Sequence, residues 1–330
     1  MSLKSPLVSI IVPMYNAEGF LARSLDSLLS QTYQEIEVVA VNDSSSDGTL
    51  NLLEQYSQRD SRVTIITVPQ QGSAKARQAG IKKSSGDYIG FLDSDDWAEP
   101  EFIESLISSL VQEDVDIASC GYLFEYEGSS RATKPWGCDH AVRHEGEAVL
   151  RGFYEQDGTS DVTMWNKIYK RNMFRDVEFP SGVAPGEDFC VMTQILRNAE
   201  SLYYVGRAYI HHAQRMNTIA HKVGYDKKQL AAIRYFLKLE TEMCLEHPTI
   251  APAIRSFTID KMVYAALPMF RAGELNQELL DTVRNHINEH YKEYRSNPYS
   301  DKRFRRAGVM IAKSPRLFAA AYSVWIKTLW

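Results

Sequence analysis

Cysteine, long apolar runs and an excess of charge of one sign are all scarce in this sequence. The four cysteines are scattered and show neither zinc-ligand spacing nor the density of a small disulfide framework: Cys120, Cys138, Cys190 and Cys244. We therefore expect free thiols in a reducing compartment, with a structural disulfide as the alternative. The N-terminal apolar stretch is short, is broken by Pro13 and is followed by no small-residue cleavage site, so we expect a cytoplasmic protein.

The composition excludes two broad classes of protein. A formal net charge of -5 gives the chain no overall attraction to nucleic acid, so any anionic ligand must be held by local groups. Hydrophobic residues make up 44% and charged residues 24% of the 330 residues, which is ordinary for a folded globular protein and argues against wholesale disorder. A chain of this length holds one large domain or two ordinary ones.

The N-terminal part alternates apolar runs with helical patterns. Strands are expected over 8–15, 36–43, 63–68, 87–93 and 115–126, and helices over 20–31, 47–58, 74–84 and 99–110. This alternation predicts a mainly parallel, Rossmann-like α/β sheet with helices on both faces. A loop is expected over 128–140, short helical and strand patterns follow, and another strand is expected over 201–212.

The C-terminal part reads as helical from about residue 225. Helices are expected over 227–246, 254–270, 278–294 and 316–330. We place the domain boundary near residue 222, which gives an α/β domain over 1–222 and a helical domain over 223–330.

Acidic side chains gather where three of the expected parallel strands end. Asn16, Asp43 and the run Asp93, Asp95 and Asp96 all follow such strands, at the edge where open α/β sheets bind ligands. Neighbouring carboxylates repel one another unless a cation or hydrogen-bond donors offset the repulsion. The run therefore indicates a missing positive charge, although Asp96 equally suits a helix cap or a solvated loop.

An ordered set of motifs carries a family resemblance. In sequence order the motifs are VSIIVPMYN, VNDSSSDGT, GSAKARQAG, FLDSDD, WNKIYK, GEDF and HHAQRMNT. Together they resemble the family-2 glycosyltransferases with the GT-A nucleotide-sugar fold, over residues 7–221. The resemblance implies an inverting glycosyltransferase that moves a sugar from a nucleotide-diphosphate sugar, with UDP favoured, to a hydroxyl of a glycan or lipid-linked acceptor. Cell-surface or capsular polysaccharide synthesis is the expected setting.

The resemblance assigns donor and metal ligands at the strand ends. Asp95 and Asp93 match the family's Asp-X-Asp motif and would hold Mn²⁺ or Mg²⁺, with His212 a weaker candidate ligand. The cation would stabilise the charge that develops on the departing diphosphate. The expected donor-binding residues are Pro13, Tyr15, Asn16, Asp43, Arg77, Asp93, Ser94, Asp95 and Arg215. Asp43 would accept the N3–H of uracil, and Arg77 would hold Asp93 or a phosphate. Asp47 suits a helix cap better than a ligand contact, and Tyr15 suits the core as well as the base.

The resemblance also assigns the acceptor side. Asp188, next to Glu187 in GEDF, would act as the general base that removes the proton of the attacking hydroxyl. Helix capping by both acids is the alternative. Trp165, Asn166 and Lys167 would contact donor or acceptor, and for Trp165 the core is the rival location.

The end of the chain and the function class leave alternatives open. A basic cluster over 302–306 precedes the aromatic-rich run over 316–330, which is too short and too charged to span a bilayer. The basic cluster and the run together suit contact with an anionic membrane surface, which would be the inner face of the plasma membrane. The alternatives are that the run packs on its own domain or forms the contact of a homodimer. A nucleotidyltransferase and a catalytically inactive sugar-nucleotide-binding module remain the alternative functions.

Overall fold

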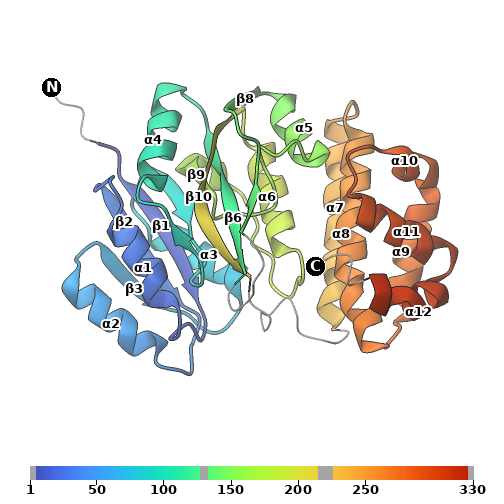
Figure 1. The fold of residues 1–330 in the computed structure, drawn as a ribbon, viewed down its shortest axis with the longest axis horizontal. Coiled ribbons are helices and arrows are strands. Elements are labelled where there is room, and N and C mark those ends of the chain that lie inside the picture. Colours follow the sequence, from blue (N-terminus) through green and yellow to red (C-terminus); the bar gives the residue numbers. More distant parts are fainter. Residues whose placement is uncertain (1–4, 127–132, 215–225, 326–330) are drawn as a thin grey trace. The chain divides into compact units, whose positions relative to one another are not determined.

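The structure is a computed structural model that describes residues 5–126, 133–214 and 226–325, with side chains up to Tyr322. It contains two compact units (Figure 1). The sheet unit comprises residues 1–152, 157–181 and 191–215, and the helical unit comprises residues 153–156, 182–190 and 216–330. The boundary that we expected near residue 222 lies outside the described residues. The two short segments 153–156 and 182–190, which join the helical unit, were not expected there.

A single ten-stranded sheet forms the centre of the sheet unit. Its main path runs β3-β2-β1-β4-β9-β6-β10-β5, with β7 beside β6 and β8 beside β10. The first four strands in this order are parallel, and β6 is parallel to β10, whereas β9, β5, β7 and β8 pair antiparallel. The strands are β1 (Val8–Met14), β2 (Ile36–Asn42), β3 (Val63–Thr67), β4 (Tyr88–Phe91), β5 (Trp97–Ala98), β6 (Ile117–Tyr126), β7 (Lys134–Trp136), β8 (Val142–Glu145), β9 (Lys167–Lys170) and β10 (Ser201–Gln214). The half of the sheet from β3 to β4 is parallel, as predicted, but the sheet as a whole is mixed, because five of the nine pairs of described strands are antiparallel.

The register of the central strands brings their carboxyl ends together. Val8 pairs with Ile36 on one side and with Tyr88 on the other, and every residue of β1 is buried. Pro13 lies inside β1 rather than ending it. The backbone nitrogen of Pro13 points toward β4, but the pairing of β1 with β4 ends earlier, at Ile11 and Phe91. The missing N–H of Pro13 therefore removes no hydrogen bond between the two strands.

Four helices pack against the sheet, close to their expected positions. They are α1 (Leu21–Leu29), α2 (Thr49–Arg59), α3 (Ser73–Lys83) and α4 (Phe102–Gln112). The leucines at 21, 25 and 28 of α1 recur at helical spacing and are all fully buried, as the sequence pattern predicts. α3 packs on β1 and β2, and α4 packs on β6 and β10.

The middle of the chain departs from the expected pattern. Part of the expected loop 128–140 forms β7, and β9 inserts antiparallel between β4 and β6. The remaining elements here are α5 (Glu147–Glu155), the 3₁₀ helix η1 (Arg171–Phe174) and α6 (Glu187–Arg197).

The helical unit is built around two long helices that pack on each other, α7 (Lys227–Glu246) and α8 (Ala251–Ala272). The expected helix over 278–294 is split into α9 (Gln277–Glu289) and α10 (Tyr291–Ser296), and α11 (Lys302–Lys313) covers the basic cluster. The final described helix is α12 (Pro315–Trp325). Among the residues that the structure describes, we find no helix with the length and apolar character needed to cross a membrane.

Candidate active site

The loops that follow β1 and β2 are joined by hydrogen bonds. Asn16 has a positive φ of 51°, and its side-chain Oδ1 accepts a hydrogen bond from the Ser46 backbone N at 2.8 Å. The backbone N of Asn16 donates to Ser45 Oγ at 3.0 Å. The two loops therefore form one frame at the carboxyl edge of the sheet, and Asn16 stays exposed within it.

Asp47 completes this frame. Its Oδ1 accepts the Thr49 backbone N at 3.0 Å at the start of α2, and its Oδ2 accepts the Glu18 backbone N at 3.1 Å. The pKa of Asp47 is held below its usual value because these hydrogen bonds outweigh the effect of partial burial. Asp47 thus orders the helix start, as the capping interpretation predicts.

Asp43 is buried and faces the loop before α3. Its two carboxylate oxygens accept the backbone N–H groups of Gln71 at 2.9 Å and Gly72 at 2.8 Å. Gly72 has a φ of 91°, a conformation that side chains other than glycine rarely adopt. Asp43 therefore ties the end of β2 to the loop that precedes α3, and each oxygen keeps a second lone pair for a ligand donor.

Tyr15 lies at the open end of β1. Its side chain is 40% exposed, so the alternative of core packing is wrong and the ring is accessible to a ligand. Pro13 is buried inside β1, so its ring is not exposed to a ligand.

Arg77 and Asp93 form an ion pair at the end of β4. The Arg77 side chain is buried in α3, and its Nη2 lies 2.7 Å from Asp93 Oδ1. The prediction that Arg77 holds Asp93 is confirmed in this structure. The pair fixes one oxygen of Asp93 and leaves the rest of the carboxylate, which is partly exposed, to face solvent.

Ser94 and Asp95 occupy the turn after Asp93. The turn is closed by the Asp96 backbone N, which donates to the carbonyl of Asp93 at 3.0 Å, and both Ser94 and Asp95 are half-buried. Arg23 Nη2 lies 3.4 Å from the carbonyl of Asp95. Asp93, Ser94 and Asp95 therefore lie in a tight turn just after the end of β4.

Asp96 is neither a helix cap nor a solvated loop residue. It is fully buried, and its Oδ1 accepts the Ala213 backbone N at 2.9 Å while Oδ2 lies 3.0 Å from His212 Nδ1. Burial raises the pKa of Asp96, and its carboxylate raises the pKa of His212 against the effect of that ring's own burial. The pair joins the residue that precedes β5 to β10, the antiparallel neighbour of β5 in the sheet.

The carboxylates make this end of the sheet a site that a divalent cation fits. Asp93, Asp95 and Asp96 all lie near His212, and the charge of each raises the pKa of that ring. Oxygen ligands of this type suit Mg²⁺ and Mn²⁺. The Asp96 bond at Nδ1 also fixes the ring of His212, in the way that metal-binding histidines are oriented by a carboxylate.

Sequence reasoning missed a second arrangement on β10. His211 lies between Glu99 and Glu125, at 2.7 Å and 2.8 Å from its two ring nitrogens, and it stacks on Trp97 with ring centroids 4.8 Å apart. Arg23 covers Trp97 at 3.6 Å. The adjacent histidines in HHAQ were the only signal in the sequence, because the acids lie far away in the chain.

Trp165 is a core residue. Its side chain is 3% exposed. Its ring contacts Tyr122 edge-on and stacks on His212, with ring centroids 4.7 Å and 5.0 Å apart. This burial favours the core, the rival location, over direct contact with donor or acceptor. Trp165 supports the ring of His212 instead.

Asn166 and Lys167 are also fully buried. Lys167 Nζ donates to Asn166 Oδ1 and to the Thr163 carbonyl, both at 2.7 Å, and lies 3.2 Å from Asp161 Oδ1. Asn166 Nδ2 donates to the Cys120 carbonyl at 2.7 Å. Direct substrate contact by either side chain is not compatible with this burial, so they shape the 161–165 loop.

Glu187 and Asp188 form the first turn of α6 and belong to the helical unit. The preceding Gly186 has a φ of 112°, and a Cβ there would lie 2.4 Å from the ring of Phe236. Phe189 is buried against Phe236 and Phe257, with ring centroids 5.1 Å and 5.6 Å apart. Tight packing thus holds this acidic turn, whose two side chains are half-buried.

Tyr264 of α8 is a neighbour of the acidic turn that the sequence did not reveal. Its side chain is 36% exposed, but loss of solvent around the hydroxyl raises its pKa, the charges of Glu187 and Asp188 raise it further, and Arg271 opposes them. Arg215 and the rest of the segment 215–225 lie outside the described residues, so the expected phosphate contact stays a prediction.

The comparisons with known sequences place the chain in a family. The profile described as Glycosyl transferase family 2 matches residues 9–178. The glycosyltransferase GlyA of Streptococcus pneumoniae is 31% identical over 61% of this chain and 30% of its own length. The putative glycosyltransferase EpsH of Bacillus subtilis is 32% identical over 52% of this chain and 49% of its own length. The chain thus spans about a third to a half of these relatives.

A solved structure shares the fold of nearly the whole chain. Staphylococcus aureus TarS 1-349, crystallised in complex with UDP-GlcNAc, is 19% identical and superimposes with a TM-score of 0.73 over 96% of this chain and 91% of its own. The likeness supports a GT-A fold followed by helices. Since the family profile covers more than half of its residues, the chain belongs to glycosyl transferase family 2.

Proposed function

We propose that this protein transfers a sugar from a UDP-sugar, with inversion, to a hydroxyl of a glycan or lipid-linked acceptor in cell-surface polysaccharide synthesis. The observation that carries the proposal is the Asp93-Ser94-Asp95 turn at the carboxyl end of β4, with Asp93 held by the buried Arg77. The same sheet edge carries Asn16, Asp43 and the accessible Tyr15. UDP-GlcNAc binding by the TarS structure supports a UDP-sugar donor.

The residues of the sheet unit would bind and orient the donor. Asp43 would accept a donor N–H of the base beside its backbone bonds, and Tyr15 would cover the ring. Asp93 and Asp95, with His212 oriented by Asp96, would hold Mn²⁺ or Mg²⁺, which stabilises negative charge on a departing diphosphate. Arg77 keeps Asp93 in place so that its carboxylate enters the site in one orientation.

Asp188 would act on the acceptor. Inverting transfer is a single displacement in which the acceptor oxygen attacks the anomeric carbon while a base takes its proton. A half-buried carboxylate on a tightly packed helix start meets the need for a positioned base, and Glu187 beside it would help to orient the acceptor.

The setting at a membrane is part of the proposal. The basic side chains of α11 and the 68% exposed Leu317 of α12 support contact with the anionic inner face of the plasma membrane. Co-sedimentation with anionic liposomes tests this, with a chain truncated after Ala312 expected to lose binding. Equal binding by both chains would reject the membrane role of α12, and a concentration-dependent dimer that fails to bind liposomes would assign it to subunit contact.

The donor and base assignments are tested together by two variants. We expect calorimetric titration with UDP, GDP and dTDP to show Mn²⁺-dependent binding of UDP, lost in Asp95→Ala and retained in Asp188→Asn. Transfer by Asp188→Asn should fall by about 10²–10⁴, because a general base contributes that much. UDP release is measured with a panel of UDP-sugars and glycan acceptors.

The outcomes separate the alternatives. Turnover retained in Asp188→Asn would reject it as the base, and binding of no nucleotide would reject the donor site. Pyrophosphate release from a nucleoside triphosphate would favour a nucleotidyltransferase. Tight UDP-sugar binding with neither transfer nor hydrolysis would favour an inactive binding module.

A further inference from the structure

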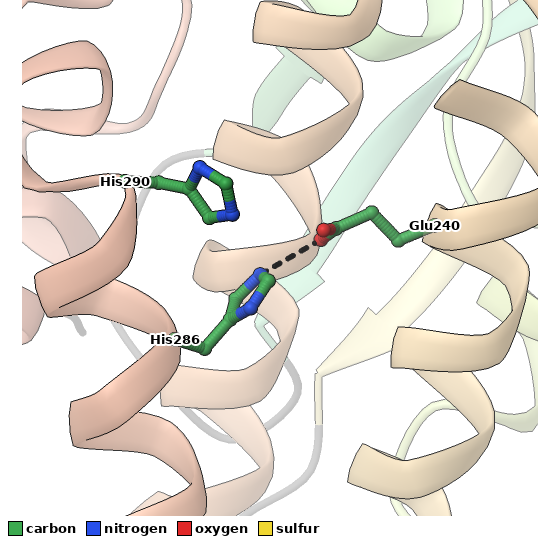
Figure 2. Close-up of side chains that lie close together, drawn as sticks. All are labelled: Glu240, His286 and His290. Carbon is green, nitrogen blue, oxygen red and sulfur yellow. Dashed lines mark hydrogen bonds and ion pairs between the residues drawn. The ribbon is translucent and has the colours of Figure 1, made fainter. Parts of the chain in front are cut away.

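Three metal-ligating side chains meet inside the helical unit (Figure 2). Glu240 comes from α7, His286 from the last turn of α9, and His290 from the junction of α9 and α10. One ligand atom from each lies within 4.8 Å of the other two. No motif of the sequence pointed to them, because Glu240 is 46 residues from His286.

The three side chains face a common point. Figure 2 shows the Glu240 carboxylate directed from one helix toward the two imidazole rings on the other. His286 and His290 are four residues apart, which places them on one helical face, with ring centroids 4.9 Å apart. His286 Nε2 lies 3.0 Å from Glu240 Oε2. Two nitrogens and one oxygen thus converge from two helices.

Burial makes this arrangement unlike a surface cluster. The side chains of Glu240 and His286 are only 8% and 12% exposed, so the carboxylate depends on partners rather than on water. Glu240 also contributes to raising the pKa of Cys244, one turn further along α7, after the larger effect of that thiol's burial.

We propose that Glu240, His286 and His290 bind Zn²⁺ and link α7 to α9. Two imidazoles and a carboxylate are a frequent zinc ligand set, with bond lengths of about 2.0–2.2 Å and a fourth position for water. Tetrahedral ligands of such an ion lie roughly 3.4 Å apart, so small side-chain rotations close the present set. The ion takes the place of the proton that now lies between His286 Nε2 and Glu240.

The ligand chemistry distinguishes this site from the carboxylate run after β4. Imidazole nitrogens favour Zn²⁺ and similar transition metals, whereas the oxygens of Asp93 and Asp95 favour Mg²⁺ and Mn²⁺. The helical unit should therefore respond to Zn²⁺ and be indifferent to Mg²⁺. The inference does not depend on the proposed transfer reaction.

The test uses the full chain, stripped of metal with a chelator, in the Asp95→Ala/His212→Gln background, so that the ligands proposed after β4 and on β10 do not compete. Titration with Zn²⁺ should give one site per chain and raise the thermal transition of the helical unit. Cobalt substitution should give the visible absorption of a four-coordinate ion. His286→Gln keeps a donor for Glu240 but removes the nitrogen ligand, and His290→Gln removes the second. We expect each to weaken Zn²⁺ binding at least tenfold.

A matched control lies in the same unit. His247→Gln removes an imidazole at the end of α7, outside the cluster, and should leave Zn²⁺ affinity unchanged. Circular dichroism of each metal-free variant confirms that it folds. The proposal is overturned if the parent chain binds no Zn²⁺ at micromolar concentration, or if the double variant His286→Gln/His290→Gln binds it as tightly as the parent.

Discussion

Lys167 in the sheet unit and Asp260 in the helical unit are two buried ionisable groups whose charge is balanced in different ways. In the sheet unit, Lys167 lies 3.2 Å from the carboxylate of Asp161. The pairs of Arg77 with Asp93 and of His212 with Asp96 follow the same principle. In the helical unit, the buried Asp260 of α8 meets only neutral donors: Tyr294 Oη at 2.7 Å, Ser300 Oγ at 2.9 Å and the Asp301 backbone N at 3.2 Å.

The difference follows from what each set of residues does. Ionised pairs at strand ends keep charge in a fixed geometry next to a ligand site, at the cost of desolvation. The network of Asp260 joins α8 to α10 and to the segment before α11, and hydrogen bonds alone suffice for that. Burial raises the pKa of Asp260 to about 7, so this carboxyl group gains or loses its proton near neutral pH.

Removing the positive member of the sheet-unit pair should have the larger effect. Lys167→Met leaves the carboxylate of Asp161 and three oxygen acceptors without their cation. We expect a loss of about 3–5 kcal/mol in the free energy of unfolding, the range for breaking a buried pair. Urea denaturation measures it.

A control comes from the same strand. Lys170 also belongs to β9, but its side chain is 29% exposed and it pairs with Asp114 and Asp116 at 3.2 Å and 3.3 Å. Lys170→Met should cost less than about 1 kcal/mol, as exposed pairs do. Equal losses in the two variants would show that burial of the pair does not set its contribution.

The helical unit should show the contrast through pH. Because the pKa of Asp260 is raised, the folded protein binds more protons than the unfolded chain between about pH 4 and pH 7. The stability that this group contributes is present in full below about pH 4 and is lost as the pH rises through 7. As the pH rises from about 4 to about 7, the free energy of unfolding of the wild type should therefore fall relative to that of Asp260→Asn. The decrease is at most about 1.4 kcal/mol per pH unit.

Asp301 provides the control in the same network. Its pKa is lowered by hydrogen bonds, mainly from Arg303, that outweigh its partial burial. It is therefore ionised in both states above pH 5, and Asp301→Asn should leave the pH dependence between pH 5 and pH 8 unchanged. If the free energy of unfolding of the wild type varied with pH in parallel with that of Asp260→Asn, Asp260 would be ionised in the folded protein throughout this range. Its pKa would then not be raised by burial.

Local patterns in the sequence predicted the parallel half of the fold well. Val8, Leu25 and Ile89 lie in apolar runs whose period matches the buried faces of β1, α1 and β4. The Asp93-Ser94-Asp95 run falls at a strand end for the same reason. The expected helix over 227–246 corresponds to α7, because its pattern is long and uninterrupted.

The parts that were missed depend on partners far away in the chain. Asp96 could not be recognised as buried, since His212 is 116 residues later. Trp165 looked available to a sugar because nothing local shows that Tyr122 and His212 enclose it. α11 was not predicted because basic residues interrupt its apolar positions, and β9 is too short and polar to reveal its antiparallel insertion.

Two of the five tryptophans are in ring contact with the histidines of β10, which bears on the fluorescence of the protein. Trp97 stacks on His211 and Trp165 on His212, at centroid distances of 4.8 Å and 5.0 Å. Each indole is thus in ring contact with a histidine of β10. The intrinsic fluorescence of this protein is therefore a label-free reporter of the carboxyl edge of the sheet, and a ligand that moves the ring of His212 should change the emission of Trp165.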